Sequence, residues 1–186
     1  MIKITGGKYK GKKIKTINKI VRPTSSIKRE AFFSIIESYA IKNSINFFND
    51  KIFLDLFAGV GTMGLEAISR GIGHAIFYEN NLDVIKVLEN NCKELCQNKQ
   101  YTVIKNDIRN FKIETKFSDI SIIYIDPPYN RFDIGNLLSN LQNKINQETI
   151  IGIESSINDE FEIPQQLELI TKKKYGKANL SFLVLA

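Results

Sequence analysis

The chain has 186 residues, 43% of them hydrophobic, enough for one well-packed domain and few for a second. No apolar run reaches 18 residues and none follows the first lysines, so we expect no membrane-spanning helix and no secretory signal, and interpret the protein as cytoplasmic. With one histidine and two cysteines, no metal centre is expected, and Cys92 and Cys96 are predicted to be reduced thiols.

Positive charge is concentrated at the N-terminus. Residues 1–29 contain ten Lys or Arg and no acidic residue, whereas the remaining sixteen basic and twenty acidic residues give the rest of the chain a charge of −4. A basic segment on an otherwise acidic protein suits phosphate binding, and a solvated charged tail is the alternative.

The first sixteen residues predict a small basic β-hairpin. Ile2 and Ile4 alternate with polar residues, Gly6-Gly7 forms a turn, and Ile14 lies in a second short extended piece. Tyr9, among the lysines, has two interpretations: it stacks on a base, or it covers the underside of the hairpin.

A helix is predicted to begin after a loop at residues 22–25, with Thr24 or Ser25 as its cap and apolar residues at helical spacing as far as Tyr39. Lys28 and Arg29 lie in its first turns, where the helix dipole disfavours cations. We therefore expect them to pair with a phosphate or a carboxylate.

From residue 51 onward, apolar strands alternate with amphipathic helices. Strands are expected near 51–57, 75–79, 101–104, 122–125 and 149–154, helices near 64–69, 82–96 and 134–145, and a final strand pair near 167–173 and 180–185. This alternation predicts βαβ units and a mostly parallel sheet. The final pair, with no helix between its strands, predicts a hairpin with an antiparallel member. Leu82 is expected on the buried face of its helix.

A glycine motif follows the first of these strands. Gly59, Gly61 and Gly64 have the spacing of a dinucleotide-binding loop, and Glu79 lies where an acid can bind a ribose diol, so NAD binding is a competing interpretation. Asp55 favours a different ligand. A carboxylate at that point suits a cationic amine, such as the methionine moiety of S-adenosylmethionine.

Acidic residues close four successive predicted strands. Asp107 follows the third strand, where it can accept from an adenine amino group while Ile108 packs on the ring, and Asp126 closes the fourth. With Asp55 and Glu79 these acids are expected to face one crevice, because the carboxyl ends of parallel strands share one edge.

The fourth strand ends in Asp126-Pro127-Pro128-Tyr129. Two prolines stop the strand abruptly and fix the turn. A carboxylate, unpaired carbonyls and an aromatic ring are thereby held together, which suits a planar amine: two acceptors take its N–H groups, and the ring stacks on the base.

This motif is similar to the signature of methyltransferases that act on amino groups, and the whole chain resembles the RsmD family, which modifies the exocyclic N2 of a guanine in small-subunit ribosomal RNA. The matching pieces are Gly6-Gly-Lys-Tyr-Lys-Gly11, Arg22-Pro-Thr-Ser25, Arg29-Glu-Ala-Phe32, Asp55-Leu-Phe-Ala-Gly-Val-Gly61, Gly64-Leu-Glu-Ala67, Ser69-Arg-Gly71, Glu79, Asp107, Asp126-Pro-Pro-Tyr129 and Tyr175-Gly176.

The resemblance implies a single Rossmann-like class I methyltransferase domain over residues 1–186, with a basic arm at 1–24 and a catalytic core at 25–186. It implies a seven-stranded sheet in the order 3-2-1-4-5-7-6, with the seventh strand antiparallel and helices on both faces. It also implies S-adenosylmethionine as cofactor, ribosomal RNA or an assembling small subunit as partner, and a monomer.

The resemblance assigns roles residue by residue. Catalysis falls to Asp126, Pro127, Pro128 and Tyr129, with Asp126 or water taking the proton. The expected cofactor-binding residues are Asp55, Phe57, Gly59, Gly61, Glu79, Asn80, Asp107, Ile108 and Asp126. The expected RNA-binding residues are Lys8, Lys10, Lys12, Lys13, Arg22, Thr24, Arg29 and Tyr175, with the Lys172–Lys177 run as a further candidate.

Two alternatives stay open. A DNA adenine or cytosine methyltransferase shares the Asp126 motif, although 186 residues leave no room for a separate target-recognition domain. A catalytically silent RNA-binding assembly factor could use the same fold, although an intact Asp126 and Tyr129 argue against it.

Overall fold

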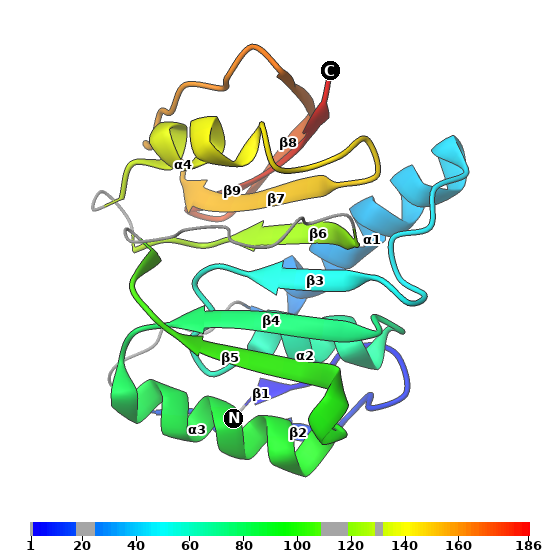
Figure 1. The fold of residues 1–186 in the computed structure, drawn as a ribbon, viewed down its shortest axis with the longest axis vertical. Coiled ribbons are helices and arrows are strands. Elements are labelled where there is room, and N and C mark those ends of the chain that lie inside the picture. Colours follow the sequence, from blue (N-terminus) through cyan, green and yellow to red (C-terminus); the bar gives the residue numbers. More distant parts are fainter. Residues whose placement is uncertain (1, 18–24, 109–118, 129–131) are drawn as a thin grey trace.

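The computed structural model describes residues 2–17, 25–108, 119–128 and 132–186, and a seven-stranded sheet forms the centre of this part of the chain (Figure 1). Its strands are β3 (Ile52–Asp55), β4 (His74–Glu79), β5 (Tyr101–Lys105), β6 (Ile120–Ile125), β7 (Ile150–Ser156), β8 (Leu167–Tyr175) and β9 (Ala178–Leu185). They lie in the order β5-β4-β3-β6-β7-β9-β8, and β9 runs antiparallel to both neighbours. Counted from β3, this confirms the expected order 3-2-1-4-5-7-6.

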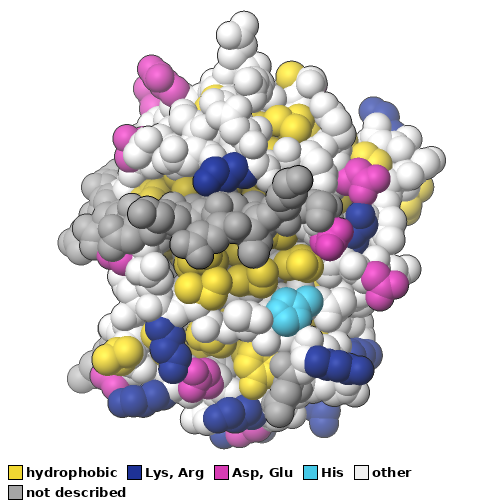
Figure 2. All heavy atoms as spheres, in the orientation of Figure 1, with side chains coloured by type: hydrophobic (Ala, Val, Ile, Leu, Met, Phe, Trp, Pro, Cys, Tyr) yellow, Lys and Arg dark blue, Asp and Glu magenta, His cyan; other side chains and the backbone are white. Residues whose placement is uncertain are grey.

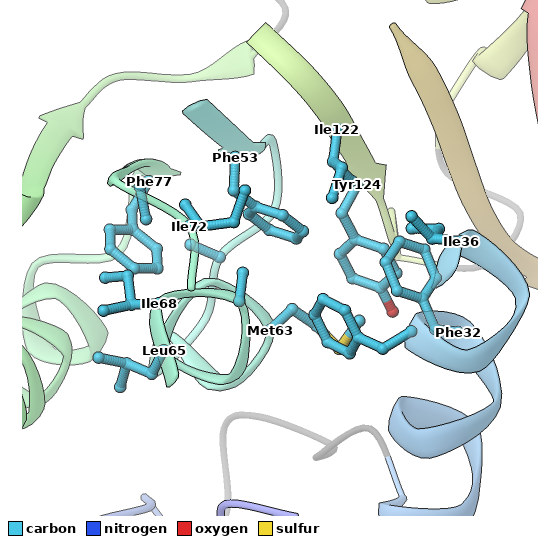
Figure 3. Close-up of a cluster of buried hydrophobic side chains, with 14 of the residues drawn as sticks. Phe32, Ile36, Phe53, Met63, Leu65, Ile68, Ile72, Phe77, Ile122 and Tyr124 are labelled. Atoms are coloured by element: carbon cyan, nitrogen blue, oxygen red, sulfur yellow. The ribbon is translucent and has the colours of Figure 1, made fainter. Parts of the chain in front are cut away.

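Helices cover both faces of the sheet, as expected. On one face lie α1 (Ser26–Asn43), α2 (Thr62–Ser69) and α3 (Leu82–Leu95), which share a core with the sheet residues Phe53, Phe77 and Tyr124 (Figure 3). On the other face α4 (Ile134–Leu141) packs on Leu54 and Ile123. The alternation of side chains along a strand explains this division, because neighbouring residues point to opposite faces.

One predicted core position is wrong. Leu82 was expected on the buried face of its helix but is 67% exposed. It is the first residue of α3, and Asn81 caps the helix by accepting from the N–H groups of Asp83 and Val84. The buried side chains of α3 begin at Val84, two residues further along, and continue with Ile85 and Leu88.

The N-terminal hairpin is confirmed, and it packs against the domain. It consists of β1 (Ile2–Lys3) and β2 (Lys13–Ile14), paired antiparallel, and the side chains of Ile2, Ile4 and Ile14 are buried in the α2 and α3 side of the core. Its underside is therefore apolar. Tyr9 is partly buried against the same core, while the Lys8 ammonium lies 4.6 Å from the centre of its ring.

A glycine pair fixes the tip of the hairpin on the end of α2. Gly7 has a φ of +72°, and a Cβ there would lie 1.8 Å from the Ser69 carbonyl oxygen. The Lys8 N–H donates to that carbonyl at 2.8 Å, and the Ser69 hydroxyl donates to the Gly6 carbonyl at 2.6 Å. Only glycine allows this approach and this backbone conformation.

The remaining described helix is the short 3-10 helix η1 (Asn98–Gln100), which leads into β5. Of the helices in the described ranges, none is both long enough and apolar enough to cross a membrane.

Candidate active site

The acids predicted at the strand ends lie along one edge of the sheet. Asp55 is the last residue of β3, Glu79 is the last residue of β4, Asp107 follows β5 by two residues, and Asp126 directly follows β6. These strands are parallel neighbours in the order β5-β4-β3-β6. Their carboxyl ends therefore meet at one crevice, which is where open α/β sheets bind ligands.

Asp55 is the most deeply buried of these acids, at 1% exposure. Burial raises the pKa of Asp55 to about 7, and the charge of Glu79 adds to this, whereas the N–H groups of Phe57 and Gly64 oppose it. Its Oδ1 has no hydrogen-bond partner among the residues that the structure describes. A buried carboxylate oxygen without a donor is costly, so this atom points to a ligand that carries a donor.

The loop between β3 and α2 is shaped by its glycines. Gly61 precedes α2 with a φ of +86°, and a Cβ there would lie 2.3 Å from the Leu88 side chain. The Gly59 N–H donates to Glu79 Oε2 at 3.0 Å, while Glu79 Oε1 accepts from the N–H groups of Asn80 and Asn81. The Glu79 carboxylate is thus fixed by three backbone donors beside the loop.

Asn80 connects the second and third strand ends. Its side-chain amide donates to Asp107 Oδ2 at 3.3 Å. Ile108 is 7% exposed and packs into the core on the α4 side, which limits the surface it offers to a ring. Phe57 is partly buried, and its ring meets Phe132 edge-on with 4.9 Å between centroids.

Asp126 lies within a cluster of charged and polar groups. The Tyr124 hydroxyl is 3.5 Å from Asp126 Oδ2 and 3.2 Å from Glu154 Oε2, and Lys28 of α1 forms an ion pair with Glu154. Burial raises the pKa of Asp126 well above its usual range, and the charges of Glu154 and Asp55 add to this, whereas Lys28 and the Tyr124 hydrogen bond oppose it.

A groove opens beside the two prolines. It has a volume of about 920 Å³ and is bounded by Pro127, Pro128, Phe132, the start of α4 and residues 158–165. Its wall carries the acidic side chains of Asp133, Asp159, Glu160 and Glu162. Such a wall repels phosphate, so it suits the edge or face of a base better than a nucleic-acid backbone.

The residues predicted to bind RNA lie in different parts of the structure. Lys8, Lys10, Lys12 and Lys13 are all exposed on the hairpin. The hairpin tip lies at the C-terminal end of α2, while the glycine loop precedes its N-terminal end, and eight helical residues span about 12 Å. The basic tip is thus set apart from the acids. Figure 2 also shows Lys and Arg side chains along the lower edge of one face, near α3, with acidic side chains between them.

The expected role of Arg29 in RNA binding is wrong. Its side chain is 2% exposed, its guanidinium donates to the Lys3 carbonyl at 2.7 Å, and Nε lies 3.7 Å from Glu66 Oε2. The expectation that the cations at the start of α1 pair with an acid is confirmed instead, because Lys28 meets Glu154 and Arg29 meets Glu66.

Other predicted residues lie at the margin or outside this description. Arg22, Thr24 and Tyr129 lie outside the described residues, and the cap of α1 is Ser25, whose hydroxyl accepts from the Lys28 N–H. Tyr175 is partly buried at the end of β8, and Lys172, Lys173 and Lys174 are exposed along that edge strand.

Sequence reasoning missed two neighbours of Asp126. Tyr124 lies two residues before Asp126, so the two side chains leave the same face of the chain. Glu154 follows the apolar run Ile150–Ile153 as Asp126 follows Ile122–Ile125, and this same signal could have identified it as an acid near the end of β7, which continues to Ser156.

Comparisons with known proteins match nearly the whole chain. The family model described as "Conserved hypothetical protein 95" matches residues 2–184. The Ribosomal RNA small subunit methyltransferase D of Buchnera aphidicola subsp. Acyrthosiphon pisum is 33% identical, over 92% of this chain and 87% of that protein.

Solved structures agree in fold. The putative methyltransferase yhhF from Escherichia coli superposes with a TM-score of 0.83 and 25% identity, over 99% of this chain and 97% of that one. An RNA methyltransferase from Salinibacter ruber in complex with S-adenosyl-L-homocysteine has a TM-score of 0.66 at 12% identity, over 88% and 94% of the two chains. The fold is thus the Rossmann-like class I methyltransferase fold, and the chain belongs to the RsmD family.

Proposed function

We propose that this protein transfers a methyl group from S-adenosylmethionine to the exocyclic N2 amine of a guanine in small-subunit ribosomal RNA. The observation that carries the proposal is the pairing of two acids on adjacent strands: Asp55 with an unpartnered buried oxygen, and Asp126 before a rigid Pro-Pro turn. The family membership, and the printed names of the relatives, support ribosomal RNA as the substrate class.

The residues at the crevice fit the cofactor. Asp55 Oδ1 accepts an N–H of the methionine ammonium. This oxygen is buried, carries negative charge when the carboxyl group is ionised, and accepts no hydrogen bond from the described residues. Glu79 Oε2, which among the described residues accepts only from the Gly59 N–H, keeps acceptor capacity for a ribose hydroxyl, while the glycine loop lets the backbone approach. Asp107 takes the adenine amine, and Asn80 holds that carboxylate in place.

When bound, S-adenosylmethionine supplies a methyl group activated by a positively charged sulfur. Asp126 and the Pro127 carbonyl accept the two N–H groups of the guanine amine, which directs its lone pair toward that methyl group. The gain is mainly orientation, which can contribute several kcal/mol to lowering a barrier. Asp126 or water accepts the proton that the methylated amine loses. The groove beside Pro127 receives the extruded base, and Tyr129 stays a predicted stacking partner.

The proposal is tested by transfer of labelled methyl from S-adenosylmethionine to four acceptors side by side. These are small ribosomal subunits from cells lacking the enzyme, protein-free ribosomal RNA, transfer RNA and duplex DNA, each digested to nucleosides afterwards. N2-methylguanosine from the ribosomal samples alone is the expected result. Methyladenine or methylcytosine in DNA would overturn the substrate, and methylation at another position of guanosine would overturn the assignment of the N2 amine.

Asp55→Asn is expected to weaken binding of S-adenosylhomocysteine, which retains the ammonium group, by about 10- to 100-fold, since a charge-assisted hydrogen bond contributes about 1.5–3 kcal/mol. In the unaltered protein, binding should tighten as the pH rises through about 7, because the ammonium requires the ionised carboxylate. Calorimetric titration from pH 5.5 to 8.5 measures both effects. The variant should lose this pH dependence. Asp50→Asn, at the other end of β3, is the matched control, and equal affinity in both variants would refute the role of Asp55.

Replacing Lys8, Lys10, Lys12 and Lys13 together with Gln is expected to raise KM for RNA and to leave cofactor binding unchanged, because these exposed side chains reach only phosphate. Each lost phosphate contact should reduce the slope of log affinity against log salt by about 0.7 to 0.9. Filter binding at several salt concentrations measures this. The control is Lys42→Gln with Lys144→Gln, and an equal slope in the two variants would contradict a role for the hairpin.

A further inference from the structure

We propose that Tyr124, Glu154 and Lys28 form a positioning unit for Asp126: the Tyr124 hydroxyl holds the Asp126 carboxylate, and the Lys28–Glu154 ion pair controls its charge. The inference rests on the proposed function, in which ionised Asp126 accepts an N–H of the substrate amine. It assigns roles to three residues that the sequence did not connect with the active site.

The fold places these groups together from three elements. In the parallel pair β6 and β7, Ile125 lies opposite Ile153, so the next residues, Asp126 and Glu154, emerge side by side. Both side chains leave the sheet on the face covered by α1. The first turn of α1 crosses these strand ends there and brings the Lys28 ammonium onto Glu154, which is 2% exposed.

Tyr124 is held rigidly between the two carboxylates. Its ring packs edge-on against Phe32, with centroids 5.1 Å apart and planes at 84° (Figure 3). A Cβ on Gly152 would lie 2.1 Å from the Phe32 ring, so the glycine opposite Tyr124 makes room for this packing. The hydroxyl is thereby fixed 3.2 Å from Glu154 and 3.5 Å from Asp126.

The Tyr124 hydroxyl has one proton, so it can donate a hydrogen bond to only one of the two carboxylates at a time. The negative charge of Glu154 beside Asp126 favours the protonated form of Asp126. The arriving amine offers N–H donors and requires the ionised form. Lys28 reduces the cost of that ionisation by neutralising Glu154, and Tyr124 can then turn its proton toward Asp126.

The groups that face Asp126 shift its pKa in opposite directions. Burial, Glu154 of β7 and Asp55 of β3 raise its pKa, whereas Lys28 of α1 and the hydroxyl of Tyr124 lower it. Arg29 also approaches this region from α1, but its charge is paired with Glu66. Removing either partner of the Lys28–Glu154 pair should therefore change the ionisation of Asp126 with opposite sign.

The test is a titration of the Asp126 carboxyl by carbon NMR in protein labelled at aspartate, with Asp126→Asn used to assign the signal. Glu154→Gln should lower the midpoint by about 1 pH unit and Lys28→Met should raise it by a similar amount. Tyr124→Phe, which keeps the ring, should raise it as well. The acidic limb of kcat/KM should move in the same direction in each variant.

Control variants make the result specific. Lys51→Met and Glu148→Gln disrupt an exposed ion pair near the opposite ends of β3 and β7 and should leave the midpoint unchanged. The double variant Lys28→Met with Glu154→Gln removes both charges and should return the midpoint toward that of the unaltered protein, even if one single variant folds poorly.

Opposite shifts for the two single variants support the inference, and so does a double variant whose midpoint lies between a shifted single variant and the unaltered protein or returns to the unaltered value. Shifts of the same sign, or none, overturn it, because a purely structural pair would not move the midpoint in opposite directions. The titration needs no methyl acceptor. Absence of guanine methylation with the expected midpoints would therefore count against the proposed function, while unchanged midpoints with normal methylation would count against the positioning unit alone.

Discussion

Asp126→Ala is expected to reduce the rate of methyl transfer by about 10²- to 10⁴-fold while the protein stays folded and binds S-adenosylhomocysteine normally. The substitution removes the acceptor that we propose orients the amine. It should not lower stability, because the carboxylate it removes is disfavoured by burial and by the charge of Glu154. Single-turnover transfer to small ribosomal subunits, with thermal unfolding and calorimetric binding alongside, measures the three quantities separately.

Two further variants sharpen this prediction. Asp126→Asn keeps one oxygen acceptor but cannot take a proton, so it should retain more activity than Asp126→Ala and lose the acidic limb of the pH profile. Glu148→Gln, an exposed acid before the opposite end of β7, is the matched control and should transfer normally. A wild-type rate for Asp126→Ala would exclude the proposed role. If the unaltered protein binds ribosomal RNA but methylates nothing, the silent assembly factor becomes the better interpretation.

The strand ends could be predicted from the sequence because each is marked twice. An apolar run gives the buried strand, and a polar or turn residue gives the place where it stops, as at Asp55 and Asp126. The order of the strands could not be obtained from this pattern and came from the family resemblance. The ends of some strands were harder to predict. The strand expected near 167–173 extends to Tyr175 as β8, because exposed lysines are compatible with a strand at the edge of a sheet.

Contacts between elements were beyond the reach of the sequence. Arg29 is one of ten basic residues among the first 29, and nothing in that segment distinguishes a buried guanidinium from an exposed lysine. Its partner Glu66 lies 37 positions away on α2, where the sequence pattern does not distinguish it from an exposed acidic residue. Only the packing of α1 beside α2 brings them together, and the packing of α1 on β7 brings Lys28 to Glu154.

Glu66→Ala is expected to have the largest effect on stability, a loss of about 3–5 kcal/mol, because it leaves a buried guanidinium without its counter-charge. The Glu66 carboxylate is fully buried and accepts from the N–H groups of Thr5 and Gly6, from the Thr5 hydroxyl and from Arg70. The substitution therefore also removes the anchor of the N-terminal hairpin. Urea unfolding measures the loss, and Glu94→Gln, in the exposed pair with Lys15, should change stability by no more than about 1 kcal/mol.

The two partners of this pair should not be equivalent. Arg29→Met leaves Glu66 with Arg70 and the hairpin donors, so it should cost less than Glu66→Ala. Combining Arg29→Met with Glu66→Ala removes the unpaired charge and should recover part of the loss, but the N–H groups of Thr5 and Gly6 would still lack their acceptor. If the double variant were as stable as the unaltered protein, the carboxylate would matter only as a counter-charge. If it were no more stable than Glu66→Ala, anchoring of the hairpin would account for the whole effect.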